Sequence, residues 1–326
     1  MKVEHVKDAA ALKEWQAVSA ACWDHDHVAI PADPLEERLP AIDAEAPNAG
    51  EKDEFLLGLI DDRPVAASEI NLPLLDNLKS ASVRVQVLPE LRRKGYGAAL
   101  LAAALEHVAA AGRTRVFFEV PSAYPDGDPQ AGRLLSNVGA RPVLKEVRRL
   151  LDLTRRPKLD VAVADGYRVV QWVDHAPDDL VEGLAVLSAR MSTDAPQEKM
   201  DWEPEVWDAE RYRKKEAAAV ARGRVRYAGA AVHEATGQVV AMTDIGVNRG
   251  RPDVAYQWDT IVLTEHRGHG LGLALKARNH DLLVESSPES RWVNTWNAEV
   301  NAHMVAINER LGFQPVEYWT EWQLDR

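Results

Sequence analysis

Two short stretches of the sequence combine basic residues and glycines in a pattern that binds anions. In the second half, the apolar run 258–263 predicts a strand, residues 264–270 form a polar turn, and apolar residues at helical spacing follow. The first N–H groups of a helix lack partners and the helix dipole favours negative charge there, so such a turn can hold a phosphate. Glycines let the backbone approach that phosphate without an intervening Cβ. The residues expected to form this cradle are Arg267, Gly268, His269, Gly270, Leu271 and Gly272.

The same pattern occurs in the first half, between a strand predicted over 83–88 and a helix that continues to about Ala111. Arginine is followed three and five residues later by glycine in both copies, which gives the pattern Arg-x-x-Gly-x-Gly twice. We therefore expect a second phosphate cradle here. Its residues are Val87, Arg92, Arg93, Lys94, Gly95, Tyr96 and Gly97.

Other phosphate-binding motifs fit these stretches less well. A dinucleotide-binding domain would need Gly-x-Gly-x-x-Gly followed by an acidic residue after a second parallel strand, and neither is present. A P-loop is excluded because no Gly-Lys-Ser/Thr follows four spacer residues. The alternative for each copy is a helix cap followed by a solvated basic turn.

The two halves of the chain repeat one another at nearly constant spacing. Gly95 and Gly270 are 175 residues apart, and Gly139 and Gly312 are 173 apart. Each half predicts two helices, several strands, the glycine turn, a helix, a strand, a helix and a final strand, which indicates an α/β (α+β) domain with a mixed sheet. The basic, proline-bearing segment 154–158 predicts a linker between domains 1–155 and 156–326.

The Arg-x-x-Gly-x-Gly pattern between a strand and a helix resembles motif A of the GNAT superfamily of N-acetyltransferases. The order of the predicted elements also matches the GNAT fold, so the resemblance covers essentially the whole chain. It implies two tandem GNAT domains and an acyltransferase that uses acetyl-CoA. It also implies that the glycine turns hold the pyrophosphate of the cofactor.

A second stretch, 297–313, resembles motif B of the same family. Asn301, Gly312 and Phe313 match that motif, whereas Asn308 stands where the family often has a tyrosine. The family's tyrosine often protonates the departing thiolate of CoA. Asn308 cannot act as an acid, but it can donate a hydrogen bond to the sulfur or the pantetheine. The resemblance implies that Asn297 and Asn301 bond the pantetheine amides, and their alternative role is to cap or begin a helix.

The equivalent stretch of the first half departs further from motif B. Asp128 replaces the asparagine, Leu135 stands at the tyrosine position and Ala140 replaces the phenylalanine. An acidic residue beside a polyanionic cofactor is unfavourable, and the strand over 81–88 offers no carboxylate. We therefore expect a degenerate first domain, with or without bound CoA, and a catalytic second domain.

Acetyl transfer to an amine needs a base, because an alkyl ammonium has a pKa of about 10 and is not nucleophilic. The strand before the second glycine turn and its neighbour offer Asp259, Tyr256 and Asp244 as candidates. Asp259 and Tyr256 lie on opposite strand faces, and a solvated or capping role is the alternative for Asp259. The resemblance implies that backbone N–H groups of this strand stabilise the oxyanion. Those residues are Ile261, Val262 and Leu263.

These observations lead to one expected function and one alternative. The expected function is direct transfer of an acetyl group from acetyl-CoA to a primary amine of a small molecule. The alternative is a non-catalytic CoA-binding scaffold or sensor, because both halves lack the motif B tyrosine. The sequence identifies neither the acceptor amine nor the oligomeric state.

Composition narrows the cellular context. The chain has no apolar run of 18 residues and no secretory core at its N-terminus, so we expect a cytoplasmic protein with no membrane partner. The single cysteine, Cys22, fits a reducing compartment. A net charge of −12 argues against a nucleic-acid partner and is compatible with a cationic substrate. The cluster Cys22–His27 has no zinc-site spacing, so no metal is expected.

Overall fold

The computed structural model describes residues 1–27, 30–194, 196 and 198–326, and it divides the chain into two compact units. The first unit comprises residues 1–146, 198–201 and 317–326, and the second comprises 147–197 and 202–316. The C-terminal segment of the chain thus belongs to the first unit. The division of the sequence into two domains at residue 155 stays a prediction.

The first unit is built on a mixed sheet in which five strands from the N-terminal part are joined by the last strand of the chain. Within the unit the strand order is β1-β2-β3-β4-β5-β12. β4 and β5 are parallel, whereas the pairs β1–β2, β2–β3, β3–β4 and β5–β12 are antiparallel. The strands are β1 (Lys2–His5), β2 (Glu51–Ile60), β3 (Arg63–Pro73), β4 (Ser80–Val87), β5 (Arg115–Ser122) and β12 (Gln314–Asp325).

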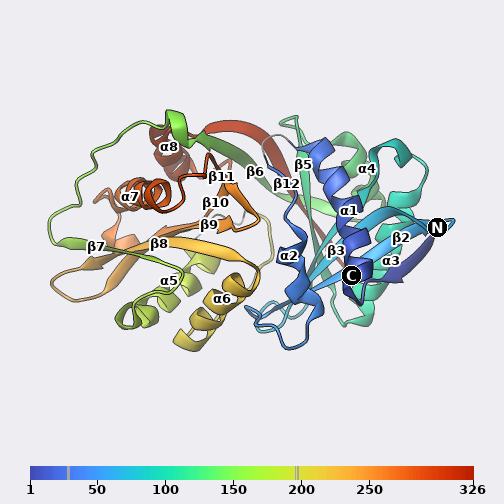
Figure 1. Cartoon of the computed structure of the whole chain (residues 1–326), viewed down its shortest axis with the longest axis horizontal. Coiled ribbons are helices and arrows are strands. Elements are labelled where there is room, and N and C mark those ends of the chain that lie inside the picture. The colour runs from blue at the N-terminus through green and yellow to red at the C-terminus, as the bar shows by residue number, and fades with distance from the viewer. Residues whose placement is uncertain (28–29, 195, 197) are drawn as a thin grey trace. The chain divides into compact units, whose positions relative to one another are not determined.

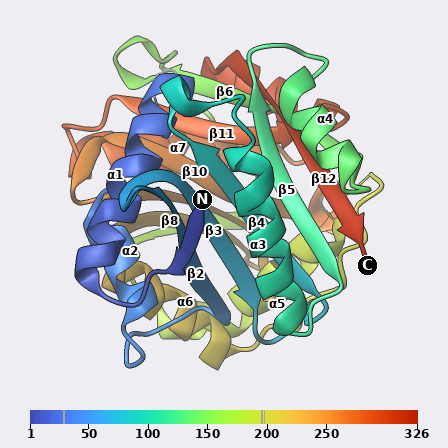
Figure 2. The same ribbon diagram turned by 90° about the vertical axis from the view of Figure 1, so that its right-hand side faces the viewer.

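Helices cover both faces of this sheet. Alternate residues of β2 point to opposite sides, so Phe55 packs with α1 whereas Leu56 packs with α3. The positions of α1 and α3 along the sheet can be followed in Figure 2. α1 begins after Asp8, whose carboxylate accepts a hydrogen bond from the N–H of Ala11 at 2.9 Å. The helices are α1 (Ala9–Asp26), α2 (Leu35–Arg38), α3 (Tyr96–Ala110) and α4 (Pro129–Asn137), with short 3-10 turns at Leu39–Ile42 and Pro89–Leu91.

The second unit repeats this plan. Its strand order includes β11-β10-β9-β8-β7, with β10 and β11 parallel and the other pairs antiparallel. The strand β6 (Arg141–Asp152) begins in the first unit and enters the second at Val147. The remaining strands are β7 (Tyr167–Val173), β8 (Arg224–His233), β9 (Val239–Asn248), β10 (Arg251–Val262) and β11 (Trp292–Ala298).

The helices of the second unit again lie on both faces of its strands. Figure 1 shows α7 and α8 on one side of β8, β9 and β10, and α5 and α6 on the other. These helices are α5 (Val181–Asp194), α6 (Ala209–Ala221), α7 (Leu271–Ser286) and α8 (Ala302–Leu311), with 3-10 turns at Leu153–Arg155, Asp178–Leu180 and Thr264–His266. The predicted mixed α/β architecture is confirmed. No helix within the described ranges has the length and apolar character needed to cross a membrane.

Candidate functional site

Both glycine turns lie where the sequence predicts them, between the central strand of a unit and the following helix. Gly95 precedes α3 with φ +87°, and Gly270 precedes α7 with φ +72°, a left-handed conformation that favours glycine. Among the residues that the structure describes, no side chain caps either helix. A Cβ added at Gly95, Gly268 or Gly270 would meet no heavy atom within 4 Å. Open space beside these glycines and uncapped N–H groups at the start of α3 and α7 are the features that a pyrophosphate-binding turn needs.

The arginine of each turn is held by the protein itself. Nε of Arg92 donates to the carbonyl of Val87 at 2.9 Å, and its guanidinium makes two bonds to the Asp26 carboxylate at 2.7 and 2.8 Å. In the second unit, Nε of Arg267 donates to the carbonyl of Val262 at 3.1 Å, and Nη2 bonds Asp194 at 3.2 Å. Each arginine thus ties its turn to the preceding strand and to the end of α1 or α5, with its charge close to the cradle.

The other predicted turn residues divide into exposed and packed groups. Arg93, Lys94 and His269 are exposed, and the His269 ring lies 5.3 Å from that of Tyr167. A Cβ on Gly97 or Gly272 would lie 3.6 or 3.7 Å from a valine of the preceding strand, an ordinary van der Waals distance, so these two glycines lie where the helix packs on the strand. The Leu271 side chain is buried in the core and Tyr96 is half-buried.

The strands before the turns end in the same hydrogen-bonding pattern. The N–H of Leu263 donates to the carbonyl of Val240 at 2.9 Å, and the N–H of Leu88 donates to that of Val65 at 3.0 Å. N–H directions alternate along a strand, so the N–H of Ile261 points toward β9, as that of Leu263 does. Of the three expected oxyanion donors, only Val262 directs its N–H away from β9. Val87 has the equivalent position in the first unit.

The parallel strands part shortly before these residues. Pairing of β10 with β11 covers Val254–Tyr256, and pairing of β4 with β5 covers Ser80–Ser82. Beyond these short ladders, the N–H groups of Val262 and Val87 point toward the side on which the strands separate. An acyl group could approach a backbone donor there.

The central strand of the second unit also carries a bulge that the first lacks. The β9–β10 register shifts between Gln257 and Thr260, so Trp258 and Asp259 stand opposite a single residue of β9. The β3–β4 ladder runs without a shift. The Asp259 carboxylate, 35% exposed, accepts a hydrogen bond from the Lys215 ammonium at 3.3 Å. Burial lowers the pKa of Lys215, and the carboxylates of Asp259 and Asp244 more than offset this and raise it.

The remaining candidates lie on β9, β10, β11 and α8. The ring of Tyr256 stacks on that of Trp296 with centroids 6.3 Å apart. Asp244 is buried and bonds the Arg226 guanidinium at 2.7 Å. Asn301 caps α8, its side chain accepting from the N–H of Met304 at 3.2 Å, so it has the helix-capping role that the sequence left open.

Asn308 is fully buried and belongs to a polar chain that sequence reasoning missed. Its Oδ1 accepts a hydrogen bond from the Lys276 ammonium at 2.6 Å, and its Nδ2 donates to Oδ1 of Asn297 at 2.5 Å. Burial lowers the pKa of Lys276 to about 7. A lysine within a helix is normally predicted to be exposed to solvent, so the sequence gives no signal that Lys276 contacts Asn308.

Comparison with known proteins agrees with this geometry. Residues 13–125 match the model of the acetyltransferase (GNAT) family. A comparison with curated proteins found no match. Among solved structures, a tandem GNAT protein from the clavulanic acid biosynthesis pathway, solved without acetyl-CoA, is 29% identical, with 99% of this chain and 98% of that chain covered and a TM-score of 0.83.

Two further structures share the fold at lower identity. A GCN5-related N-acetyltransferase from Sphaerobacter thermophilus has a TM-score of 0.69 at 17% identity, covering 99% of this chain and 95% of that one. A putative acetyltransferase from Pyrococcus horikoshii has a TM-score of 0.60 at 13% identity, covering 100% and 89%. Residues 13–125 therefore match the GNAT acetyltransferase family, and the whole chain shares the fold of a tandem GNAT protein.

Proposed function

We propose that the chain transfers an acetyl group from acetyl-CoA directly to a primary amine of a small molecule, and that the second unit performs this reaction. The observation that carries the proposal is the position of the uncapped α7 turn, directly after a bulged strand and where β10 parts from β11. Bulges recur beside active sites because they redirect backbone groups and side chains out of the ladder. The first unit has the turn but not the bulge.

Different residues of the second unit bind the cofactor and stabilise the charge that develops in the reaction. The N–H groups at the start of α7, around Gly270, hold the pyrophosphate, and acetyl-CoA supplies the activated thioester. The N–H of Val262 stabilises the negative charge that develops on the thioester oxygen. Asn297 in β11 and Asn301 at the start of α8 would contact the pantetheine arm.

Asp259 is the proposed base. Its carboxylate already accepts a hydrogen bond from one primary ammonium, that of Lys215. A substrate ammonium that replaced Lys215 would make the same contact and could lose its proton there before it attacks. Tyr256, beside the point where the strands part, is the alternative base.

Direct transfer is supported because Cys22, the only cysteine in the sequence, is a poor nucleophile and cannot readily carry the acetyl group. Cys22 is buried on α1, and burial raises the pKa of its thiol to about 11, so little thiolate exists at neutral pH. A reduced, buried thiol also fits the cytoplasm, where we place the reaction. Departure of the CoA thiolate would be assisted by Asn308 and the Lys276 ammonium bonded to it, or by water.

A small molecule as acceptor fits the structural relative from the clavulanic acid pathway, which serves small-molecule biosynthesis. The alternative is a CoA-binding scaffold or sensor. It is favoured because both polar atoms of the Asn308 side chain already bond protein groups, Lys276 and Asn297, instead of facing a thiolate. Release of free CoA thiol from acetyl-CoA in the presence of a panel of primary amines, with matched alcohols as controls, separates the two. Binding of CoA without turnover across the panel would support the scaffold.

We expect replacement of Asp259 by asparagine to lower kcat by about 100-fold and to change the KM for acetyl-CoA little, because a base acts in the chemical step. Tyr256→Phe has this effect instead if the tyrosine is the base. Asp253→Asn is the matched control, since Asp253 is an exposed carboxylate on the same strand. Full activity of the double variant Asp259→Asn/Tyr256→Phe would show that neither residue is the base. Ping-pong kinetics with an acetylated Cys22 would refute direct transfer.

A further inference from the structure

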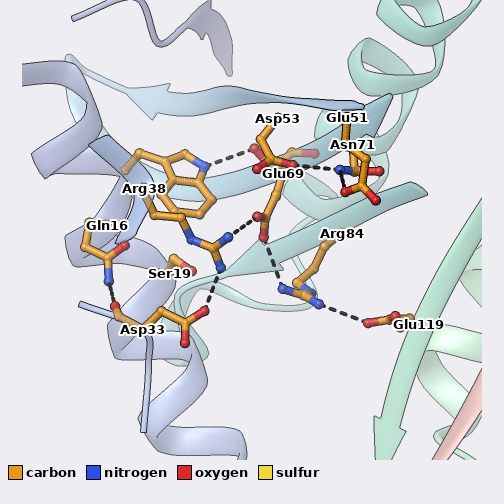
Figure 3. A network of polar contacts seen from close by, with 12 residues as sticks. Gln16, Ser19, Asp33, Arg38, Glu51, Asp53, Glu69, Asn71, Arg84 and Glu119 are labelled. Carbon is orange, nitrogen blue, oxygen red and sulfur yellow. Dashed lines mark hydrogen bonds and ion pairs between the residues drawn. The ribbon is translucent and has the colours of Figure 1, made fainter. Parts of the chain in front are cut away.

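Two half-buried arginines of the first unit lie against carboxylates. Arg84 donates to Glu69 at 3.1 Å and to Glu119 at 3.0 Å, and Arg38 donates to the other oxygen of Glu69 at 2.6 Å (Figure 3). Such pairing offsets the free-energy cost of removing a charge from water. Lys276 of the second unit is more deeply buried, and among the residues that the structure describes it has no carboxylate partner.

The Lys276 ammonium lies between α7 and α8 and contacts two uncharged side chains of α8. It donates to Oδ1 of Asn308 at 2.6 Å and lies 3.9 Å from Sδ of Met304. Because neither partner carries a charge, these contacts offset only part of the cost of burial, and burial lowers the pKa of Lys276 to about 7. The position therefore costs stability, which calls for a reason other than packing.

The first unit shows that the fold does not need a polar pair at this place. Leu101 and Leu135 precede Lys276 and Asn308 by 175 and 173 residues, the spacings of the repeat. Both leucines are buried and belong to one apolar cluster. The same architecture thus packs with two apolar side chains in the first unit, whereas the second unit has an ammonium and an amide. A buried charged group that packing does not require is a candidate for a role at a functional site.

Lys276 also sets the direction of a hydrogen-bond chain that leads to Asn297. An ammonium has donors and no acceptor, so the Asn308 amide must turn its oxygen toward Lys276. Nδ2 of Asn308 then faces Asn297 and donates to its Oδ1 at 2.5 Å. With that oxygen engaged, the half-buried Asn297 keeps the two N–H donors of its Nδ2, and within the described ranges no protein group accepts a hydrogen bond from them.

We propose that Lys276 is a positioning residue for the cofactor: through Asn308 it holds the Asn297 amide so that this amide donates to a carbonyl oxygen of the pantetheine arm. Lys276 has this role only if acetyl-CoA binds the second unit with its pantetheine arm at Asn297, as the proposed function holds. A reversed Asn297 amide would present its oxygen to the carbonyl oxygen, and two acceptors form no hydrogen bond. Fixing the amide before the cofactor arrives therefore increases affinity without contact between Lys276 and the cofactor.

Calorimetric titration with CoA tests this role. The parent protein is the whole chain with Gly95→Val, so that only the second glycine turn is intact, at pH 6, where Lys276 is mostly protonated. Lys276→Met should weaken CoA binding by about tenfold, the effect of one hydrogen bond. Binding of 3′-phosphoadenosine 5′-diphosphate, which has the phosphates of CoA without pantetheine, should be unchanged. Lys214→Met, at an exposed lysine, is the matched control and should bind CoA like the parent.

A double-mutant cycle shows whether Lys276 acts through Asn297. Asn297→Ala alone should weaken CoA binding by about tenfold, and adding Lys276→Met should cause little further loss, because the amide to be positioned is gone. If the Lys276 charge attracted the cofactor directly, the two losses would multiply instead. Lys276→Met/Asn308→Leu gives this place two apolar side chains, as in the first unit, so it should fold and show the same loss as Lys276→Met.

The outcomes separate this role from the proposed function. If the parent binds CoA and Lys276→Met binds it equally well, Lys276 does not position the cofactor, although the cofactor site stands. Equal weakening of CoA and of 3′-phosphoadenosine 5′-diphosphate, or losses that multiply in the cycle, would overturn the positioning role in the same way. A parent protein that binds neither ligand would overturn the cofactor site of the second unit, and the role of Lys276 with it.

Discussion

Replacing Gly270 with valine is expected to abolish binding of acetyl-CoA to the second unit and, with it, turnover. The added side chain would occupy the open space in front of the first N–H groups of α7, where the pyrophosphate must approach. Hydrogen bonds to a charged group are worth about 1.5–3 kcal/mol each, so losing two corresponds to about 100-fold or more in affinity. Calorimetry with acetyl-CoA measures this, in a protein whose first turn carries Gly95→Val.

The chain offers a matched control for backbone strain. Gly237, in the β8–β9 turn, has φ +73°, and a Cβ there also meets nothing within 4 Å. Gly237→Val therefore imposes the same conformational strain away from the cradle and should leave the affinity unchanged. Gly95→Val alone should retain most turnover if the second unit is catalytic. A folded Gly270→Val protein with normal acetyl-CoA affinity would contradict the proposed cofactor site.

The fold was largely predictable because its signals are local. Alternating apolar residues and the Gly95 and Gly270 turns each lie within a few residues of the element they define, and these elements appear within a few residues of the expected bounds. Two strands escaped prediction, β1 and β7. Both pair on one side only, and their residues are largely exposed or half-buried, so they lack the apolar alternation that marks an inner strand.

The parts of the sites that were not predictable depend on contacts between distant residues. Glu119 and Glu321 are adjacent only because the last strand of the chain pairs with β5, and a spacing of about 200 residues carries no pattern that reveals such a register. The sequence analysis found no carboxylate on the strand over 81–88, and Glu119 lies on the neighbouring strand β5. The sequence placed Arg92 and Arg267 in the phosphate turns but gave no signal for their partners, Asp26 and Asp194, which come from other elements.

Replacing Lys276 with methionine is expected to stabilise the protein at neutral pH, although it removes a hydrogen bond. Lys276 is 1% exposed, and burial lowers its pKa from 10.5 to about 7. At one pKa unit per 1.36 kcal/mol, this shift corresponds to a destabilisation of about 4–5 kcal/mol at pH 7 and below. Leaving Asn308 without its donor costs about 1–3 kcal/mol, so a net gain of about 2 kcal/mol is expected.

The gain should disappear as pH rises, which distinguishes this cause from better packing. Between pH 7 and 10.5 the unfolded chain binds the Lys276 proton and the folded protein does not, so wild-type stability increases with pH. Above 10.5 the lysine is neutral in both states, and only the lost hydrogen bond remains in the variant, which then becomes the less stable protein. Denaturant unfolding of both proteins from pH 6 to 11 measures the difference.

Two positions in the chain make this test specific. Leu101 precedes Lys276 by the 175 residues of the repeat and is also buried, so an apolar side chain suits the equivalent site of the first unit. Lys214→Met, at an exposed lysine of α6, controls for loss of one positive charge and should show no comparable trend. A stability difference for Lys276→Met that stayed constant with pH would mean that the buried lysine keeps its ordinary pKa. The hydrogen bond to Asn308 would then be sufficient to keep Lys276 protonated inside the second unit, where its ammonium could stabilise the departing CoA thiolate.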